Sequence, residues 1–266
     1  MSAVLLPRPL LYIFSALVGL VVGSFANVCA YRMPRNKSVV SPPSSCPRCG
    51  SRIKAYDNVP VLSYLLLLGK CRNCGESISP VYPMVELANA LLYVAAAWKY
   101  GAVPSLLFYF VFLSALLVIT LIDLDIQEIP DEITIPGAVI GILAGWLFLP
   151  DPFMRAQALG LKASLIGAAA GFSLYYLIAV VSKGGMGGGD VKMMAMVGAV
   201  TGWKGVLLTT FAGSLIGSIA GLYVIAFKGG GRKTKIPFGP FLALGVLVTI
   251  LFGQELIAWY THRGEF

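Results

Sequence analysis

The sequence has little charge for its length. Charged residues make up 12% of the 266 residues, whereas roughly a quarter of the residues of a soluble globular domain are charged. Hydrophobic residues make up 58%, so the composition excludes an ordinary soluble domain. A membrane-spanning helix needs about 20 mostly apolar residues. We therefore expect an all-α polytopic membrane protein with about eight transmembrane helices, at residues 9–31, 84–100, 103–122, 133–150, 159–181, 190–203, 204–227 and 237–260.

Histidine is almost absent, which removes two classes of protease. The single histidine is His262, in the C-terminal tail and on the predicted outside of the membrane. A Ser-His-Asp triad is thereby excluded. The sequence also lacks an HExxH pattern, so it does not encode a metalloprotease of that type.

The distribution of lysine and arginine predicts how the chain is oriented. With the N-terminus outside, fourteen of the twenty basic residues fall on the inside, at residues 32–72, 183–192 and 228–235. This is the bias expected of a membrane protein. It also accounts for the net charge of +8 through basic loops that lie against an anionic inner leaflet, without a nucleic-acid partner. The first apolar run is too long for a signal-peptide core, and we expect it to be retained as a helix.

One polar stretch interrupts the apolar pattern. Residues 32–83 are basic and proline-rich, and they predict a small cytoplasmic domain inserted between a first transmembrane helix (1–31) and a membrane-embedded domain (84–266). A domain of this size usually needs an additional stabilising element, such as disulfides or a structural metal ion. Two CxxC pairs supply candidate ligands, and four cysteine ligands with no open position predict a structural zinc site in a ribbon-like insert. The candidate ligands are Cys46, Cys49, Cys71 and Cys74.

Two alternatives concern the cysteines. The two pairs could instead form disulfides, although such bonds rarely persist in a reducing cytoplasm. The fifth cysteine, Cys29, lies in the first predicted helix, and we expect it to pack there without chemistry.

Glycine recurs every four residues in several predicted helices. Small residues at this spacing let membrane helices approach closely, so we expect tight packing and assign these glycines no chemical function. They are Gly137, Gly141, Gly145, Gly167, Gly171, Gly213, Gly217 and Gly221.

Acidic residues gather at two places on the predicted inside face. Five of the twelve lie in LIDLDIQEIPDEIT at 121–134, at the end of a predicted helix, where Asp123 and Asp125 come first. Asp190 begins another predicted helix. Two close carboxylates do not both ionise readily, so one holds a proton. The ionised one can then draw a proton from water while the other donates to a peptide carbonyl. The pattern indicates aspartyl-protease chemistry, which needs no cofactor.

The stretch GGMGGGD before Asp190 has two interpretations. Glycines allow non-helical backbone and the close approach of a substrate strand, and irregular backbone at membrane depth is tolerated where it lines a cavity. Alternatively, the glycines form a plain loop and Asp190 caps the following helix, since Asp is a good helix cap.

Taken together, these segments resemble the type IV prepilin peptidases, the family of prepilin leader peptidases and N-methyltransferases that are GxGD intramembrane aspartyl proteases. The similarity covers nearly the whole chain, with five segments in the family's order. They are GSFANVCAYRMP at 23–34, the cysteine-bearing segment from SCPRCG to PMVEL, LIDLDIQEIPDEIT, MGGGDVKMMAMVGAVTGW and IPFGPFLALG at 236–245.

The resemblance implies a function. Such enzymes sit in the bacterial cytoplasmic (inner) membrane. Their prepilin-like substrates carry a short basic leader followed by a hydrophobic helix, and the enzymes cut off the leader on the cytoplasmic side of that helix. They then methylate the new N-terminal amine with S-adenosylmethionine. Their substrates serve type IV pili, competence or type II secretion. The interacting partners are therefore prepilin or pseudopilin substrates and the lipid bilayer.

The resemblance also implies site residues. The catalytic pair matches Asp123 and Asp190, because a D-x-x-x-x-x-[IV] pattern places the first aspartate six residues before Ile129. Asp125 is then a neighbour that tunes the charge of the pair. Gly187, Gly189 and Lys192 are expected to support the site, although Lys192, two residues after Asp190 on a helix, should point away from it.

The residues that would bind the methyl donor stay unassigned, because the insert has no glycine-rich nucleotide loop after a strand. Polar side chains in and near the insert are candidates if the family role holds. They are Asn58, Arg72, Ser77 and Glu86.

Two other function classes fit some of the same residues. Paired membrane aspartates and glycine-broken helices also occur in proton- or cation-coupled transporters. However, both aspartates are predicted near one membrane face, whereas transporter sites usually lie near the midplane. A non-catalytic assembly scaffold is the third possibility, and it predicts that both aspartates are dispensable.

Overall fold

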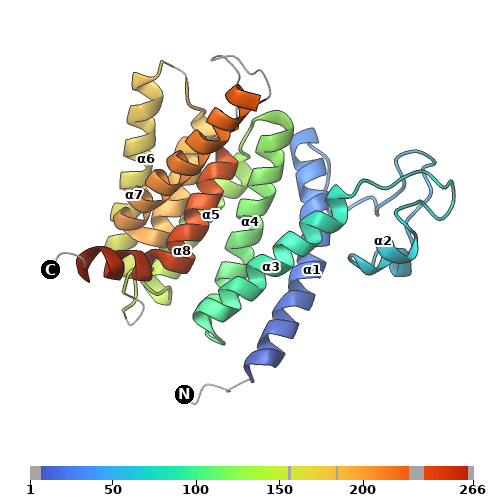
Figure 1. Ribbon diagram of the computed structural model, residues 1–266, viewed down its shortest axis with the longest axis horizontal. Helices are drawn as coiled ribbons and strands as arrows, with labels where there is room; N and C mark the ends of the chain where they lie inside the picture. The colour runs from blue at the N-terminus through green and yellow to red at the C-terminus, as the bar shows by residue number, and fades with distance from the viewer. Residues whose placement is uncertain (1–6, 155–156, 184, 228–236, 263–266) are drawn as a thin grey trace. The chain divides into compact units, whose positions relative to one another are not determined.

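The computed structural model describes residues 7–154, 157–183, 185–227 and 237–262, and the regular secondary structure within these ranges is helical (Figure 1). The whole predicted basic loop at 228–235 lies outside the described residues, as do Arg155 and Arg263, two of the six basic residues predicted on the outside. Within them the β pairing is limited to isolated bridges. The expected all-α fold is therefore confirmed.

The chain divides into two compact units, Met1–Val118 and Ile119–Phe266. The order of elements is α1 (Arg8–Arg32), η1 (Met33–Arg35), η2 (Ala55–Asp57), α2 (Leu62–Leu66), α3 (Val81–Tyr100), α4 (Ser105–Ile126), α5 (Asp131–Leu147), α6 (Gly160–Val181), α7 (Gly188–Phe227) and α8 (Gly239–His262). The predicted functional division at residues 31 and 83 stays a prediction.

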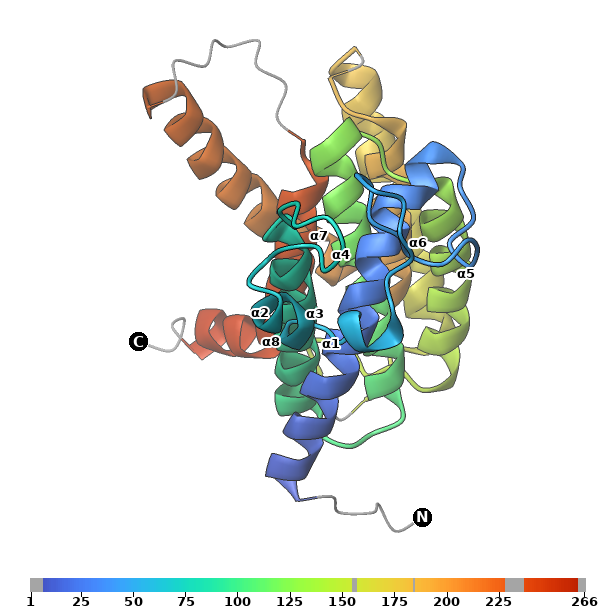
Figure 2. The ribbon, with the colours of Figure 1, turned by 90° about the vertical axis from the view of Figure 1, so that its right-hand side faces the viewer.

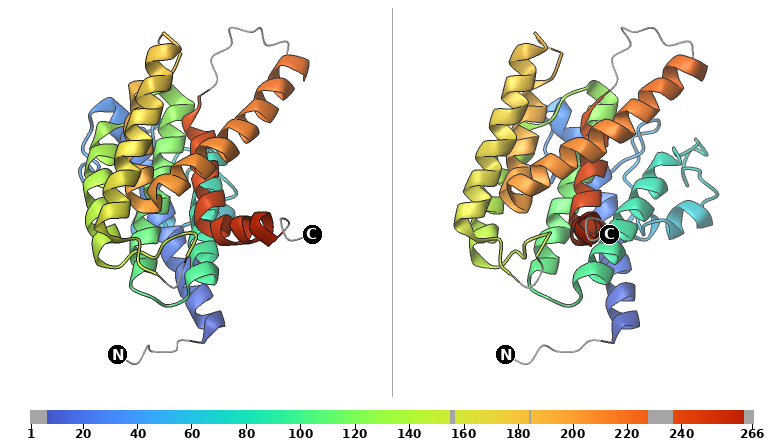
Figure 3. Two further views of the ribbon diagram at one scale, coloured as in Figure 1. Left: turned by 90° about the vertical axis from the view of Figure 1, so that its left-hand side faces the viewer. Right: turned by 60° about the vertical axis from the view of Figure 1, so that its left-hand side comes forward.

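Six of the described helices are long and apolar enough to cross a membrane: α1 with η1, α3, α4, α6, α7 and α8. Helix α5 has 17 residues, which is at the short end of the range for a spanning helix. The runs predicted at 190–203 and 204–227 form the two halves of α7. They join at Gly202, whose φ of 70° and ψ of 177° interrupt the helix. Figure 3 shows the two halves meeting at an angle.

In the first unit, α1 and α3 pack through small residues. A side chain at Gly19 would lie 2.6 Å from the Ala90 Cα, and one at Gly23 would lie 2.7 Å from the Glu86 Cα. The Asn89 amide donates to the Gly19 carbonyl at 2.9 Å. Close backbone approach and interhelical hydrogen bonds are the usual way that membrane helices associate. The insert follows α1 and precedes α3 as mostly irregular backbone (Figure 2).

In the second unit, several of the glycines predicted to pack lie against a neighbouring helix. A side chain at Gly167 would overlap the α7 backbone at Gly198, and one at Gly171 would overlap the α7 backbone at Met194. On α5, a Cβ on Gly141 would lie 3.0 Å from the Val200 Cγ2 of α7. Helix α7 is therefore held between α5 and α6 along its first half, whose first turn contains Asp190.

Candidate active site and cysteine cluster

Asp123 is buried at the end of α4. Its side chain is 5% exposed, and its Oδ2 accepts a hydrogen bond from the backbone N–H of Gly239 at 2.9 Å. Gly239 is the first residue of α8. A carboxylate at the C-terminal end of its own helix is unfavourable, but the N-terminus of a second helix offers free N–H groups and a favourable dipole. The start of α8 therefore stabilises the Asp123 carboxylate.

Asp190 is buried in the first turn of α7 and is 8% exposed. Its Oδ2 accepts a hydrogen bond from the Gly187 N–H at 3.2 Å. Asp190 is the third residue of α7 rather than the N-cap that the capping interpretation expected, and an acidic residue at this position caps its helix by accepting from the N–H of the residue before the helix. The bond uses one carboxylate oxygen only, and it leaves a role in catalysis open.

The two carboxylates lie close enough for their charges to interact. Ile129 packs beside both of the segments that hold them. A Cβ built on Gly189 would lie 2.7 Å from the Ile129 Cβ, and a Cβ on Gly239 would lie 3.4 Å from the Ile129 Cδ1 and 2.7 Å from the Asp123 Oδ2. The structure thus brings the LIDLDIQEI segment, the glycine-rich segment and the start of α8 together at one place.

The three glycines before Asp190 differ in what surrounds them. Gly189 has no room for a side chain because of Ile129, whereas a Cβ on Gly188 would meet nothing within 4 Å. A Cβ on Gly187 would lie 3.3 Å from the Asp190 Oδ2. Gly189 is therefore required for close packing of the two segments, and a side chain at Gly187 would crowd the Asp190 carboxylate.

The other acidic residues of the first segment face outward. Asp125 and Glu128 are exposed, in contrast to Asp123. Asp131, at the start of α5, forms an ion pair with Lys192, whose Nζ lies 2.6 and 2.7 Å from the two carboxylate oxygens. The expectation that Lys192 points away from Asp190 agrees with this contact. Its partner Asp131 and the role of Gly239 were not foreseen, although both residues lie in segments that carry the family resemblance.

The four insert cysteines form one cluster. Their Sγ atoms all lie within 4.8 Å of one another, and those of Cys46 and Cys74 are 3.8 Å apart. A tetrahedral zinc with Zn–S bonds of about 2.3 Å needs sulfur atoms about 3.8 Å apart. All four are free thiols. The arrangement fits four ligands of one metal ion.

Two equivalent turns build this cluster. The Gly50 N–H donates to the Cys46 carbonyl at 2.9 Å, and the Gly75 N–H donates to the Cys71 carbonyl at 2.9 Å. Both glycines have φ near 70°, a conformation that glycine adopts without strain. Each CxxC turn therefore directs two sulfur atoms to the same side.

The thiols of the cluster differ in their pKa values. Hydrogen bonding to Ser51 lowers the pKa of Cys49 to about 6. The Glu76 amide favours the Cys74 thiolate, but burial and the three neighbouring thiols raise the pKa of Cys74 to about 12. Four thiolates this close repel one another, so a bound cation is needed to keep all of them charged.

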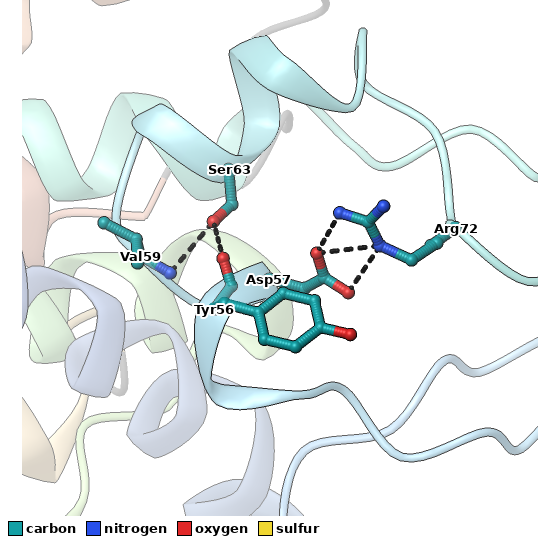
Figure 4. Close-up of polar contacts among 5 residues, drawn as sticks. All are labelled: Tyr56, Asp57, Val59, Ser63 and Arg72. Atoms are coloured by element: carbon teal, nitrogen blue, oxygen red, sulfur yellow. Dashed lines mark hydrogen bonds and ion pairs between the residues drawn. The ribbon is translucent and has the colours of Figure 1, made fainter.

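A second set of contacts orders the insert beside the cluster (Figure 4). The Arg72 guanidinium makes a bidentate ion pair with Asp57, with its shortest contact at 2.6 Å. This hydrogen bonding holds the pKa of the Asp57 carboxyl below its usual range. The Ser63 hydroxyl donates to the Tyr56 carbonyl and accepts from the Val59 N–H.

Two more polar residues of the first unit have structural partners. The Glu86 Oε2 accepts a hydrogen bond from the Val61 N–H at 2.7 Å, which ties α3 to the insert. The Asn27 amide donates to the Tyr82 carbonyl at 3.1 Å. Both side chains therefore hold neighbouring segments together.

Comparison with known proteins agrees with this geometry. Residues 17–100 match the bacterial peptidase A24 N-terminal domain, and residues 110–222 match the type IV leader peptidase family. A prepilin leader peptidase/N-methyltransferase from Pseudomonas putida is 36% identical, with 92% of this chain and 91% of that protein covered. Proteins of the same name from Pseudomonas aeruginosa (34% identical, 97% of each chain) and Bacillus subtilis (35%, 94% of this chain and 96% of that one) are also similar.

This chain belongs to the type IV leader peptidase family. The family match at 110–222 contains both Asp123 and Asp190, and the N-terminal match contains all four insert cysteines. Membership in a peptidase family gives the transporter interpretation no support. No solved structure gives a significant match to the chain.

Proposed function

We propose that this protein is an intramembrane aspartyl endopeptidase that removes the leader from type IV prepilin-like proteins. The observation that carries the proposal is the meeting of two buried carboxylates, Asp123 and Asp190, from the end of α4 and the start of α7. Each is held by a backbone N–H, at Gly239 and Gly187. The names of the full-length relatives support the choice of substrate.

In the proposed reaction the two carboxylates share one proton. The ionised carboxylate takes a proton from a water molecule, which attacks the peptide carbonyl, while the protonated carboxylate donates its proton to the carbonyl oxygen. Proton return to the amine then releases the leader. Burial of both groups lowers the local dielectric and strengthens these interactions. Asp125, exposed and two residues away, would tune the charge of the pair.

Lys192 and Asp131 would position this pair. Their ion pair joins the first turn of α7 to the first turn of α5. Lys192 lies two residues after Asp190, and Asp131 begins the helix that follows the Asp123 segment. Gly189 would contribute by allowing Ile129 to pack against the same turn. The support roles expected of Gly187, Gly189 and Lys192 are therefore proposed as positioning roles.

For the cysteine cluster we propose a structural Zn²⁺. All four sulfur atoms converge on one site rather than forming two separate pairs, which favours one metal over two disulfides. Soft thiolate ligands in a closed tetrahedron select zinc and leave no open position for catalysis. The ion would fold the insert rather than take part in cleavage.

N-methylation of the new N-terminus, with S-adenosylmethionine as donor, is also proposed from the names of the relatives. Among the four polar residues considered for the donor, Arg72 is engaged by Asp57 and Glu86 by the Val61 N–H. Because Arg72 and Glu86 already have partners within the protein, no residue is assigned to the donor.

The proposed orientation places the N-terminus outside and the insert and both catalytic aspartates on the cytoplasmic side of a bacterial inner membrane. The bias of lysine and arginine along the sequence supports it. Leader removal at the cytoplasmic face requires it as well.

The deciding experiment is cleavage of a model prepilin in membranes by Asp123→Asn, Asp190→Asn and Asp125→Asn variants. Asn keeps the size of the side chain and removes its acid chemistry. We expect the first two to lose cleavage by about a thousandfold or more, while Asp125→Asn still cuts. If Asp123→Asn and Asp190→Asn both still cut, the aspartyl mechanism is wrong and Asp190 acts as a helix cap alone.

A further inference from the structure

Helices α7 and α8 touch closely along one part of their length. A side chain at Gly245 of α8 would overlap the Thr209 carbonyl of α7. The hydroxyl groups of Thr209 and Thr249 are hydrogen-bonded at 3.0 Å. One turn further along α7, a Cβ on Gly213 would lie 2.9 Å from the Phe241 carbonyl oxygen. The two backbones are therefore in contact up to Gly213.

Beyond Gly213 the two helices separate. The nearest atoms to a Cβ on Gly217 belong to the rings of Phe241, at 3.3 Å, and Phe238, at 3.5 Å, rather than to backbone. Figure 3 shows the second half of α7 diverging from α8 toward the end of α7. The opening is a cavity of about 300 Å³ lined by Ser214, Gly217, Ser218, Phe238 and Phe241. We call this cavity the α7–α8 wedge.

The wedge adjoins the candidate active site. Phe238, which lines it, is followed directly by Gly239, whose N–H holds the Asp123 carboxylate. The Phe241 and Leu242 N–H groups donate to the Phe238 carbonyl, so this part of the lining is fixed to the first turn of α8. Since both catalytic carboxylates are buried, a peptide that reaches them must approach along a neighbouring surface. The wedge provides one that opens between membrane helices.

The lining suits an apolar helix better than a polar ligand. Two phenylalanine rings form one wall, and a glycine with two serines forms the other. Small residues allow the close approach of a second helix, and serine hydroxyls can bond across a helix pair. A volume of about 300 Å³ is at the lower end of the range for ligand pockets. It holds a few side chains from one face of a helix rather than a whole helix.

We propose that the α7–α8 wedge binds the apolar helix of the peptide substrate, on the part of the substrate next to the cleaved bond. This inference rests on the proposed endopeptidase function and adds the surface that presents the substrate to it. The wedge sets which apolar side chains are accepted near the cut, while Asp123 and Asp190 perform the cleavage.

The first test fills the wedge. Gly217→Leu places a large side chain against Phe238 and Phe241, and Ile219→Phe on the same turn is the matched control, since Ile219 is 61% exposed and is not part of the lining. The probe is a model prepilin with one membrane-spanning apolar helix. We expect Gly217→Leu to raise KM about tenfold with a smaller change in kcat, and Ile219→Phe to change neither. Equal effects of the two variants on KM would overturn the proposal.

The second test does not depend on whether Gly217→Leu folds. A photoreactive residue is placed in the apolar helix of the same model prepilin, and the substrate is bound to the Asp190→Asn enzyme. Crosslinks are expected at 214–218 and 238–241, and crosslinks confined to other helices would overturn the proposal. Loss of the endopeptidase function itself would be seen separately, as failure of the unmodified enzyme to cut the model prepilin.

Discussion

The cysteine cluster and the carboxylate pair are built in opposite ways. Each half of the cysteine cluster is a local turn, with two ligands three residues apart and a glycine at φ near 70° that closes the turn. The carboxylate pair draws on segments far apart in the sequence, with Asp123 and Asp190 from different helices and the Gly239 N–H from a third. A metal-binding turn can thus be recognised from a few residues, whereas the aspartates meet only because helices α4, α5, α7 and α8 pack.

The largest effect is expected from a substitution in the cysteine cluster. Cys71→Ser removes one of the four proposed zinc ligands, and because metal binding supplies the folding free energy of such a site, the insert should lose bound zinc and its order. Metal analysis of the purified protein is expected to fall from about one zinc per chain to almost none, with faster proteolysis within 32–83.

The fifth cysteine supplies the control for this test. Cys29 lies in α1, outside the cluster, so Cys29→Ser should keep its zinc. Full zinc occupancy in Cys71→Ser would show that the four sulfur atoms are not the ligands of one ion.

A smaller effect is expected from adding a single methyl group beside the carboxylate pair. Gly189→Ala places a Cβ 2.7 Å from the Ile129 Cβ, so the two aspartate segments must move apart, and overpacking of this kind costs about 1–3 kcal/mol. Prepilin cleavage should fall about tenfold or more.

Gly188→Ala is the matched control, because it meets nothing within 4 Å. Alanine also favours the helix by about 1 kcal/mol over glycine, so this variant should be as stable as the parent protein or slightly more stable. Cleavage reduced to the same degree in both variants would rule out the contact with Ile129 as the cause.

The smallest effect is expected from the ion pair that joins the two segments. Lys192 and Asp131 are both partly exposed, and such pairs contribute about 0.2–1 kcal/mol. Lys192→Glu alone and Asp131→Lys alone should each reduce cleavage a few-fold. The double variant restores the pair with its charges reversed and should recover most of the activity.

Glu132→Lys tests whether this recovery depends on the pairing. Glu132 is exposed next to Asp131, and Lys192→Glu should not rescue it to the same extent. Equal recovery in the two double variants would mean that net charge matters at this surface rather than the Lys192–Asp131 contact. The pH dependence of cleavage is a second readout, because a changed separation of the aspartates alters how they share a proton.

Much of the fold could be predicted because membrane helices are long apolar runs. Each of the eight predicted runs corresponds to a helix or, for 190–203 and 204–227, to one half of α7. The merging of these two runs could not be predicted, since it depends on the single backbone conformation of Gly202. The close packing of Gly167 and Gly171 against α7 was predictable from their spacing, but their partner helix was not.

The candidate site was predictable to a different degree at each residue. Asp190 and the cysteines stand in short patterns with a chemical reason, so the residues themselves could be named. Lys192 could be said to point away from Asp190, but its ion pair with Asp131 spans 61 residues and no local pattern indicates it. Gly239 could not be found, because its contribution is a backbone N–H and any residue type except proline has one.

The sequence by itself determined the membrane character, the helical segments, the cysteine turns and the candidate aspartates, because each depends on composition or on neighbours a few residues away. Only the tertiary structure decided that Ile129 packs against Gly189, that the start of α8 holds Asp123, and that α7 and α8 part beside it. These contacts join residues tens to more than a hundred positions apart, and they arise from the packing of whole helices, which a local pattern does not encode.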